Sequence, residues 1–317
     1  MNNSISMLCD SFVENKAVLK SYFGREDVSV YPVCAAMFTD RQKAATEENL
    51  EACRELLKTA ESPSEFRAAA IVPVIALLAA DENPTEKLQR SVALFAALRN
   101  YFTGSLYLAL TTMFASDMLD ENEYMEAAER ASRIGNIIDK KKILDPDDDL
   151  SMPSTLLAIA DMKNGADQNQ NAAVWNAEVI LSTLEEDFFM DDALQAQSLV
   201  LAMSGGDPKR LAKRDIEFYN SLETKNYRLG ATYAYGVFAF LSMFPDDISS
   251  INKKLFQTDS YLVNQKGYSG VFGTNKRTRL LHSAYITSIA GVYKHHQLWD
   301  AQQAAMCLAM ASAATNL

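Results

Sequence analysis

The chain has 317 residues and a net charge of −11, with 41 acidic against 30 basic side chains. A negative field of this size repels phosphate backbones and anionic lipid headgroups, so neither nucleic acid nor a membrane surface is an expected partner. Apolar residues make up 48 % of the chain and charged residues 22 %, which is near the globular average and argues against a disordered or fibrous protein.

The composition favours helices. Only 12 glycines and 8 prolines interrupt the chain, and its long unbroken segments are rich in Ala, Leu, Met, Glu and Lys, which are good helix formers. A single compact core usually stops growing at roughly 250 to 300 residues. We therefore expect either two domains or a helical-repeat array, which needs no second core.

The predicted helices come in pairs, each an Ala- and Leu-rich helix followed by a more charged amphipathic one with apolar residues at three and four spacing. We expect one helical-repeat domain over residues 1–317. It begins with an N-terminal cap helix (1–28) and continues with six helical hairpins (29–262), a glycine-rich loop (263–278) and a C-terminal hairpin (279–317). About seven stacked hairpins predict an all-α fold, an α/α superhelix (solenoid), with a closed α/α toroid as the alternative.

Capping motifs support these boundaries. Ser62 with Glu65 and Asn83 with Glu86 have the spacing of capping boxes, in which each side chain accepts from or reaches back to a free amide at the helix start. Asp120 with Glu123 marks a further helix start. Asn83 precedes a proline that can take the first helical position, where no amide partner is needed. Each motif falls at a polar turn between predicted helices.

One segment breaks the helical pattern. Residues 266–274 contain three glycines, and Lys276, Arg277 and Arg279 follow, with His282 one turn further along. Backbone amides of such a loop and of a helix start could hold an anion, so these four residues are the candidate anion or ligand site. The spacing is not that of a P-loop. The alternative is a surface loop followed by a helix whose histidine is part of the core.

No metal or cofactor is predicted. Asp145, Asp147 and Asp149 alternate as a calcium loop begins, but a leucine stands where that loop has its glycine. His295 and His296 are adjacent, so they do not share a helix face and make a poor zinc pair. We therefore expect acidic and polar turns at these places.

The cysteine pattern favours a reducing cytoplasm. The four cysteines are far apart and show no CxxC spacing: Cys9, Cys34, Cys53 and Cys307. The first ten residues lack the basic start of a signal peptide. The longest nearly uncharged run, 68–80, is shorter than the roughly 20 residues that cross a bilayer.

The order of several short strings points to a family. FTGSLY (102–107) enters one predicted hairpin, DDLSMP (148–153) enters the next, and the segment 210–222 and RLLHSA (279–284) follow. This layout resembles a bacterial family of uncharacterised proteins, catalogued as domain of unknown function 4003. The resemblance covers nearly the whole chain. It implies a bacterial cytoplasmic protein and carries no catalytic residues.

Two hypotheses for the function remain open. The leading one is a non-enzymatic interaction module, whose curved helical surface binds a protein, a peptide or a second copy of itself. The alternative is an enzyme of the α/α-toroid kind, with a central pocket lined by carboxylates and aromatic rings. Closure of the array distinguishes them, since an open solenoid has an extended groove and a toroid a central cavity.

Overall fold

The computed structural model describes residues 3–24, 29–68, 70–143, 149–167, 170–188, 192–223, 236–270 and 273–315. Within these ranges all regular secondary structure is helical, with fifteen α-helices and no strand. In the same ranges, three short 3-10 helices connect some of them: Ser64–Phe66, Glu121–Glu123 and His296–Leu298. The prediction of an all-α helical-repeat fold is confirmed.

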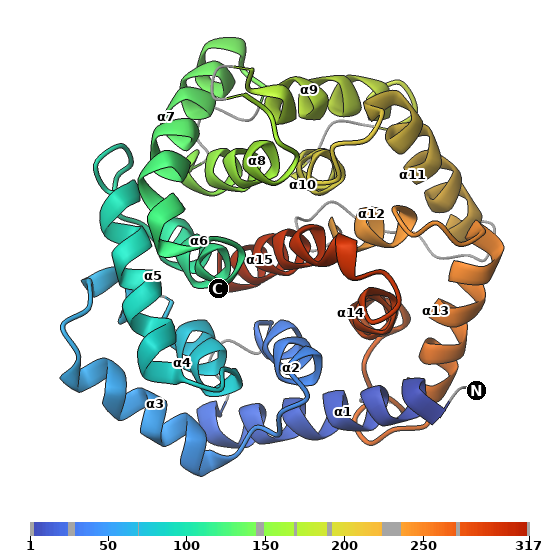
Figure 1. Ribbon diagram of the computed structural model, residues 1–317. Helices are drawn as coiled ribbons and strands as arrows, with labels where there is room; N and C mark the ends of the chain where they lie inside the picture. Colours follow the sequence, from blue (N-terminus) through green and yellow to red (C-terminus); the bar gives the residue numbers. More distant parts are fainter. Residues whose placement is uncertain are drawn as a thin grey trace.

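The helices form an outer and an inner layer around a ring (Figure 1). The outer helices are α1 (Asn3–Phe23), α3 (Glu47–Thr59), α5 (Pro84–Leu98), α7 (Tyr124–Lys141), α9 (Ala172–Leu184), α11 (Pro208–Glu223) and α13 (Ile248–Leu262). The inner helices are α2 (Tyr31–Asp40), α4 (Ile71–Ala80), α6 (Leu106–Met118), α8 (Ser151–Lys163), α10 (Asp192–Ala202), α12 (Gly236–Ser242) and α14 (Lys276–Val292). The last helix, α15 (Trp299–Thr315), lies inside the ring (Figure 1).

The two ends of the array meet. Helix α1 packs against α13 and α14, and α2 also packs against α14 (Figure 1). Across this junction Lys16 Nζ donates to the hydroxyl of Tyr268 at 2.6 Å, and the Tyr261 hydroxyl donates to Asp10 at 2.8 Å. Of the two arrangements that the sequence leaves open, the contacts are therefore those of a closed ring.

Helix α15 fills the centre of this ring. It packs against the inner helices α2, α6, α10, α12 and α14, and every residue from Ala301 to Ala314 is buried. Most of these residues are Ala, Ser, Cys or Met, whose small or flexible side chains let neighbours approach from all sides. A helix that is apolar all round belongs in the interior, and here it replaces the open channel that a ring would otherwise have.

Sequence composition explains the two layers. Every residue from Val72 to Ala80 on the inner helix α4 is buried, whereas the outer helix α7 buries one face at three and four spacing. Gly135 on α7 allows a close approach to α8, because a Cβ at this position would lie 3.0 Å from Ser154 Oγ. Inner helices thus carry the continuous apolar runs and outer helices the amphipathic pattern.

Two of the three predicted capping motifs are present. The Asn83 side chain accepts from the amide of Glu86, and Asp120 with Glu123 forms a capping box. The motif at Ser62 is wrong: its hydroxyl is buried without a hydrogen-bond partner, and only a 3-10 turn follows. The reason is tertiary, because Phe66 turns into the core against Phe95, with ring centroids 5.3 Å apart.

The glycine-rich segment makes turns before α14, with Gly267 and Gly270 at positive φ. Helix α14 begins at Lys276, three residues earlier than predicted. Val271 and Phe272 of the loop, the predicted hairpin start at 228–235, and Asp145 and Asp147 lie outside the described residues. All four cysteines are buried, and they form no disulfide within the described residues. In the described ranges no helix is both long and apolar enough to cross a membrane.

Candidate functional site

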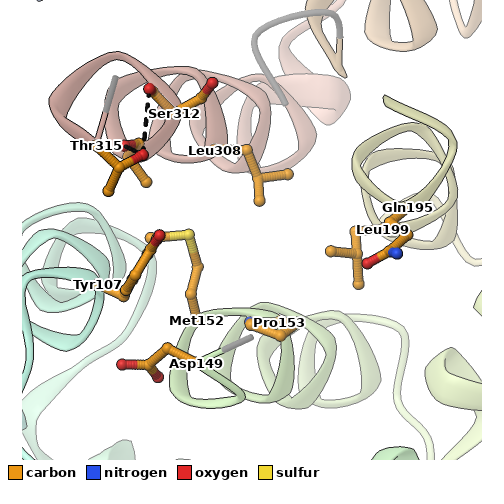
Figure 2. A pocket seen from close by; sticks show the side chains of 10 residues that line it. Tyr107, Asp149, Met152, Pro153, Gln195, Leu199, Leu308, Ser312 and Thr315 are labelled. Carbon is orange, nitrogen blue, oxygen red and sulfur yellow. Dashed lines mark hydrogen bonds between the residues drawn. The ribbon is translucent and has the colours of Figure 1, made fainter. Parts of the chain in front are cut away.

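Pockets lie at both ends of α15. The larger, which we call the polar pocket, lies at the start of α15 and has a volume of about 400 Å³. Its lining residues are Asp40, Arg41, Arg90, Asp117, Val292, Tyr293, His296, Trp299 and Gln303. The smaller pocket lies at the other end of α15 (Figure 2). A concave cavity with several converging polar groups is where a binding site is expected, so the polar pocket is the candidate functional site.

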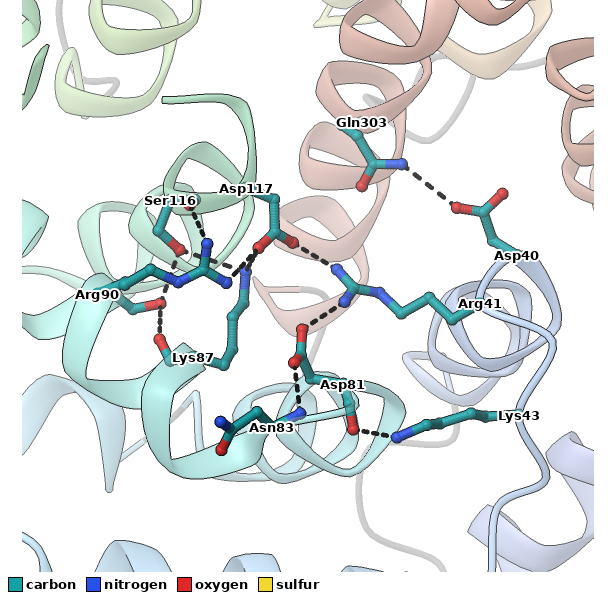
Figure 3. A network of polar contacts seen from close by, with 11 residues as sticks. Asp40, Arg41, Lys43, Asp81, Asn83, Lys87, Arg90, Ser116, Asp117 and Gln303 are labelled. Carbon is teal, nitrogen blue, oxygen red and sulfur yellow. Dashed lines mark hydrogen bonds and ion pairs between the residues drawn. The ribbon is translucent and has the colours of Figure 1, made fainter. Parts of the chain in front are cut away.

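The polar pocket lies where inner helices end. Asp40 is the last residue of α2, and Asp117 is the penultimate residue of α6. The last carbonyl groups of a helix have no partner within the helix and carry partial negative charge, which attracts basic side chains. Accordingly, Arg90 from α5 donates to the carbonyl oxygen of Ser116 at 3.3 Å, and Lys43 donates to that of Asp81 (Figure 3).

Asp117 is the centre of a charged network. Its carboxylate lies 2.6 Å from Lys87 Nζ and 3.3 Å from Arg90, and it also pairs with Arg41, whose other nitrogen pairs with Asp81 (Figure 3). Burial lowers the pKa of Lys87 to about 8, even though Asp117 opposes the effect. Burial also raises the pKa of Asp117, but Lys87 and Arg41 outweigh burial and hold it below its ordinary value. Asp117 is therefore a fixed negative charge.

Asp40 differs from the other carboxylates of the pocket. It forms no salt bridge within the described ranges, and burial raises the pKa of its carboxyl group. Its nearest polar partners are the side-chain amides of Gln302 and Gln303, each with Nε2 3.4 Å from a carboxylate oxygen. The other amide atom of Gln303, Oε1, is buried and has no hydrogen-bond partner among the residues that the structure describes. These two acceptors are the under-used groups of the pocket.

Aromatic rings form another part of the lining. Tyr293, with 39 % of its surface exposed, and the exposed His296 stand beside the half-buried Trp299. The Tyr293 hydroxyl donates to the backbone carbonyl of Asp40 at 3.1 Å, which ties the aromatic residues to the end of α2. The pocket thus combines aromatic faces, a carboxylate without an ion pair, and guanidinium groups.

The four residues predicted as an anion site have different environments. Lys276 and Arg277 are exposed in the first turn of α14. Arg279 forms a two-pronged ion pair with Asp259 of α13, at 2.8 and 3.2 Å. His282 is buried, with Nδ1 2.8 Å from the Tyr268 hydroxyl, and burial lowers its pKa well below the ordinary value. Arg279 and His282 therefore face separate partners, and anion binding at this helix start stays a prediction.

The sequence contains a signal for the polar pocket that its local motifs do not reveal. Three Ala-rich helices end near an aspartate: Asp40, Asp81 and Asp117. A carboxylate at a helix C-terminus is unfavourable next to the negative end of the helix dipole, so each such residue requires a compensating group from elsewhere.

Within the described residues no group of three His, Cys, Asp or Glu side chains is placed to hold a metal ion.

A repeated basic position supplies several compensating groups. Arginines from three outer helices reach carbonyl oxygens that follow or end an inner helix: Arg90 to Ser116, Arg130 to Ala166 and Arg214 to Ser242. Each arginine lies six residues after the first residue of its helix, which is Pro84, Tyr124 or Pro208. This spacing is visible in the sequence once the helix starts are known.

Comparison with known proteins places the chain in a family. The family described as "Protein of unknown function (DUF4003)" matches residues 17–311, so the chain belongs to it, and the resemblance noted in the sequence is confirmed. No curated protein matches the chain, and no solved structure does. Its function is therefore argued from the geometry of the polar pocket.

Proposed function

We propose that this protein binds a small zwitterionic molecule, of the amino-acid or short-peptide class, in the polar pocket. The observation that carries the proposal is a mismatch of charges across the pocket. Asp40 has no ion pair within the described residues, whereas the three cations Arg41, Lys87 and Arg90 share the two carboxylates of Asp81 and Asp117. A ligand with one positive and one negative charge complements both Asp40 and the group of cations.

The cationic end of the ligand belongs beside Asp40. An ammonium group there would gain a charge-assisted hydrogen bond from the carboxylate and could also donate to the unpartnered Gln303 Oε1. The rings of Tyr293 and Trp299 add negative π faces that attract cations. The net charge of −11 favours the approach of a positive group, although the nearby guanidinium groups oppose a ligand that is only cationic.

The anionic end belongs beside Arg41 and Arg90. Both guanidinium groups line the pocket, and Arg90 Nε is buried without a hydrogen-bond partner in the described ranges. A ligand carboxylate adds the third negative charge that this group of three cations lacks, and guanidinium groups hold carboxylates well. A purely anionic ligand would instead be repelled by Asp40, so the zwitterion is favoured.

This proposal narrows the interaction-module hypothesis. A short peptide carries one ammonium and one carboxylate at its two ends, as an amino acid does, so a peptide partner remains within the proposed class. The ring is closed, as the enzyme hypothesis expects, but α15 fills the centre where that hypothesis places its cavity, and the polar pocket gives it less support. Asp117 is held charged by Lys87 and Arg41, which leaves Asp40 as the one carboxyl group of the lining with a raised pKa.

Isothermal titration of the protein with free amino acids and dipeptides tests the proposal. We expect saturable binding of at least one of them, weakened about 30-fold by Asp40→Asn, because removing one partner of a charge pair leaves the other uncompensated. Trp299→Leu should weaken the same ligand through loss of the aromatic face.

Asp139→Asn is the matched control, since this exposed residue lies on α7 and pairs only with Lys142 within the described ranges. It should leave the affinity unchanged. The proposal is wrong if no zwitterion in the panel binds, or if Asp40→Asn binds as tightly as the control.

A further inference from the structure

The pocket at the other end of α15, which we call the apolar pocket, has a different lining (Figure 2). It is small, about 40 Å³, and residues of α15 and of the inner helices α6, α8 and α10 line it. Its lining residues are Tyr107, Asp149, Met152, Pro153, Gln195, Leu199, Leu308, Ala311, Ser312 and Thr315. Apolar side chains dominate this set, so the hydrophobic effect favours a ligand with an apolar part.

One buried polar atom belongs to this pocket. Gln195, which lines the pocket (Figure 2), has only 5 % of its surface exposed, and its side-chain oxygen Oε1 has no hydrogen-bond partner among the described residues. A buried acceptor that has lost its water without gaining a donor costs free energy, and a ligand that donates to it recovers this cost. The unpartnered oxygen therefore specifies a donor on the ligand.

The apolar pocket does not favour an anionic ligand, although α6 and α8 begin beside it. The Ser105 side chain already accepts from the amide of Leu108 at 3.0 Å, and the Asp149 side chain accepts from that of Ser151 at 2.8 Å. These caps use amides that an anion would need, and the Asp149 carboxylate at the pocket repels negative charge. A neutral ligand meets neither obstacle.

The geometry points to the apolar pocket as a second binding site, for a small neutral molecule whose apolar part lies among Met152, Leu199 and Leu308 and whose hydroxyl or amide donates to Gln195 Oε1. The volume accommodates a short alkyl group, either as a free alcohol or as the end of a longer molecule. This site is separate from the polar pocket, so a negative result at one pocket does not contradict the binding proposed at the other.

Two isomeric probes test the donor requirement. Butan-1-ol and diethyl ether have the same formula, but only the alcohol can donate a hydrogen bond. We expect both to shift the NMR signal of the Met152 methyl group in methyl-labelled protein, with butan-1-ol binding about 5-fold more tightly. Gln195→Leu should abolish this preference.

Gln197→Leu is the matched control, because Gln197 is on the same helix and also has a buried, unpartnered Oε1 but does not line the pocket. It should keep the 5-fold preference. Leu308→Phe, which places a larger side chain in the pocket, should remove the response to both probes. NMR spectra of each variant establish that it is folded.

Equal affinities for the two probes in the unmodified protein would overturn the inference. So would a preference that survives Gln195→Leu, or a Met152 response that survives Leu308→Phe. Should Gln195→Leu fail to fold, the comparison of the two probes and the Leu308→Phe variant still decide the question.

Discussion

The two ends of the central helix α15 differ in how they satisfy the helix termini around them. At the apolar pocket α6 and α8 begin, and the neighbouring side chains Ser105 and Asp149 accept from their first amides. At the polar pocket helices end, and cations such as Arg90 come from other helices to meet their carbonyl groups. Helix starts can be capped by residues next in sequence, whereas these helix ends depend on tertiary contacts.

This difference explains the chemistry of each pocket. Local caps leave the walls of the apolar pocket free to be apolar. At the polar pocket the basic side chains that reach carbonyl groups must be balanced by carboxylates such as Asp117, so charge accumulates. The comparison can be tested by removing one group at a time.

The largest effect is expected from Asp117→Asn. The change leaves Arg41, Lys87 and Arg90 with one carboxylate, Asp81, and Lys87 has only 1 % of its side chain exposed. Breaking a buried ion pair from one side typically costs about 3 to 5 kcal/mol, and we expect a loss of about 3 kcal/mol in the free energy of unfolding at pH 7. Urea denaturation measures it. A loss no larger than that of the exposed control Asp139→Asn would show that the network is not stabilising.

Asp215→Asn should have the opposite effect and increase the free energy of unfolding. Asp215 on α11 is fully buried, its carboxylate oxygens lack hydrogen-bond partners in the part of the chain that the structure describes, and burial raises its pKa to about 7. The hydroxyl of the nearby Ser242 donates instead to Ala239 at 2.7 Å. Because a charged carboxylate without a cation is costly, we expect the variant to be more stable by about 2 kcal/mol at pH 8.

The pH dependence of this gain in stability follows from the raised pKa of Asp215 in the native state. The native state holds the Asp215 proton up to about pH 7, whereas the unfolded state loses it near the ordinary value of 3.8. Native protein therefore binds more protons between these values, and its stability falls as the pH rises through them. Urea denaturation from pH 4 to pH 8 should show the advantage of Asp215→Asn growing with pH. An advantage that does not change with pH would contradict this account.

The smallest effect is expected from Ser105→Ala, at the apolar end. It removes the side-chain acceptor of the Leu108 amide and nothing that crosses to another helix. Loss of such a cap typically costs about 1 kcal/mol. Thermal and urea unfolding should show that loss without a change in the pH profile. A loss as large as that of Asp117→Asn would mean that the two ends do not differ in the way described.

Much of the helical layer structure could be predicted because it depends on local patterns. Apolar periodicity distinguishes the amphipathic α7 from the continuously apolar α4, and caps such as Asn83 mark helix starts within a few residues. Where a local pattern failed, a distant contact was the cause. The cap predicted at Ser62 does not form, because Phe66 packs against Phe95, which is 29 positions further along the chain.

The candidate sites illustrate the same limit. Arg279 and His282 share one helix, as their spacing indicates. The sequence does not reveal that Arg279 would pair with Asp259 and that His282 would hydrogen-bond to Tyr268. The sequence by itself determined the helices, their order and many of their caps, since these depend on neighbours within a few residues. Only the tertiary structure decided the ring closure, the central position of α15 and the polar pocket. Arg41 meets Asp117 across 76 positions, and Asp40 meets Gln303 across 263, and no local periodicity encodes contacts that depend on how the whole chain folds.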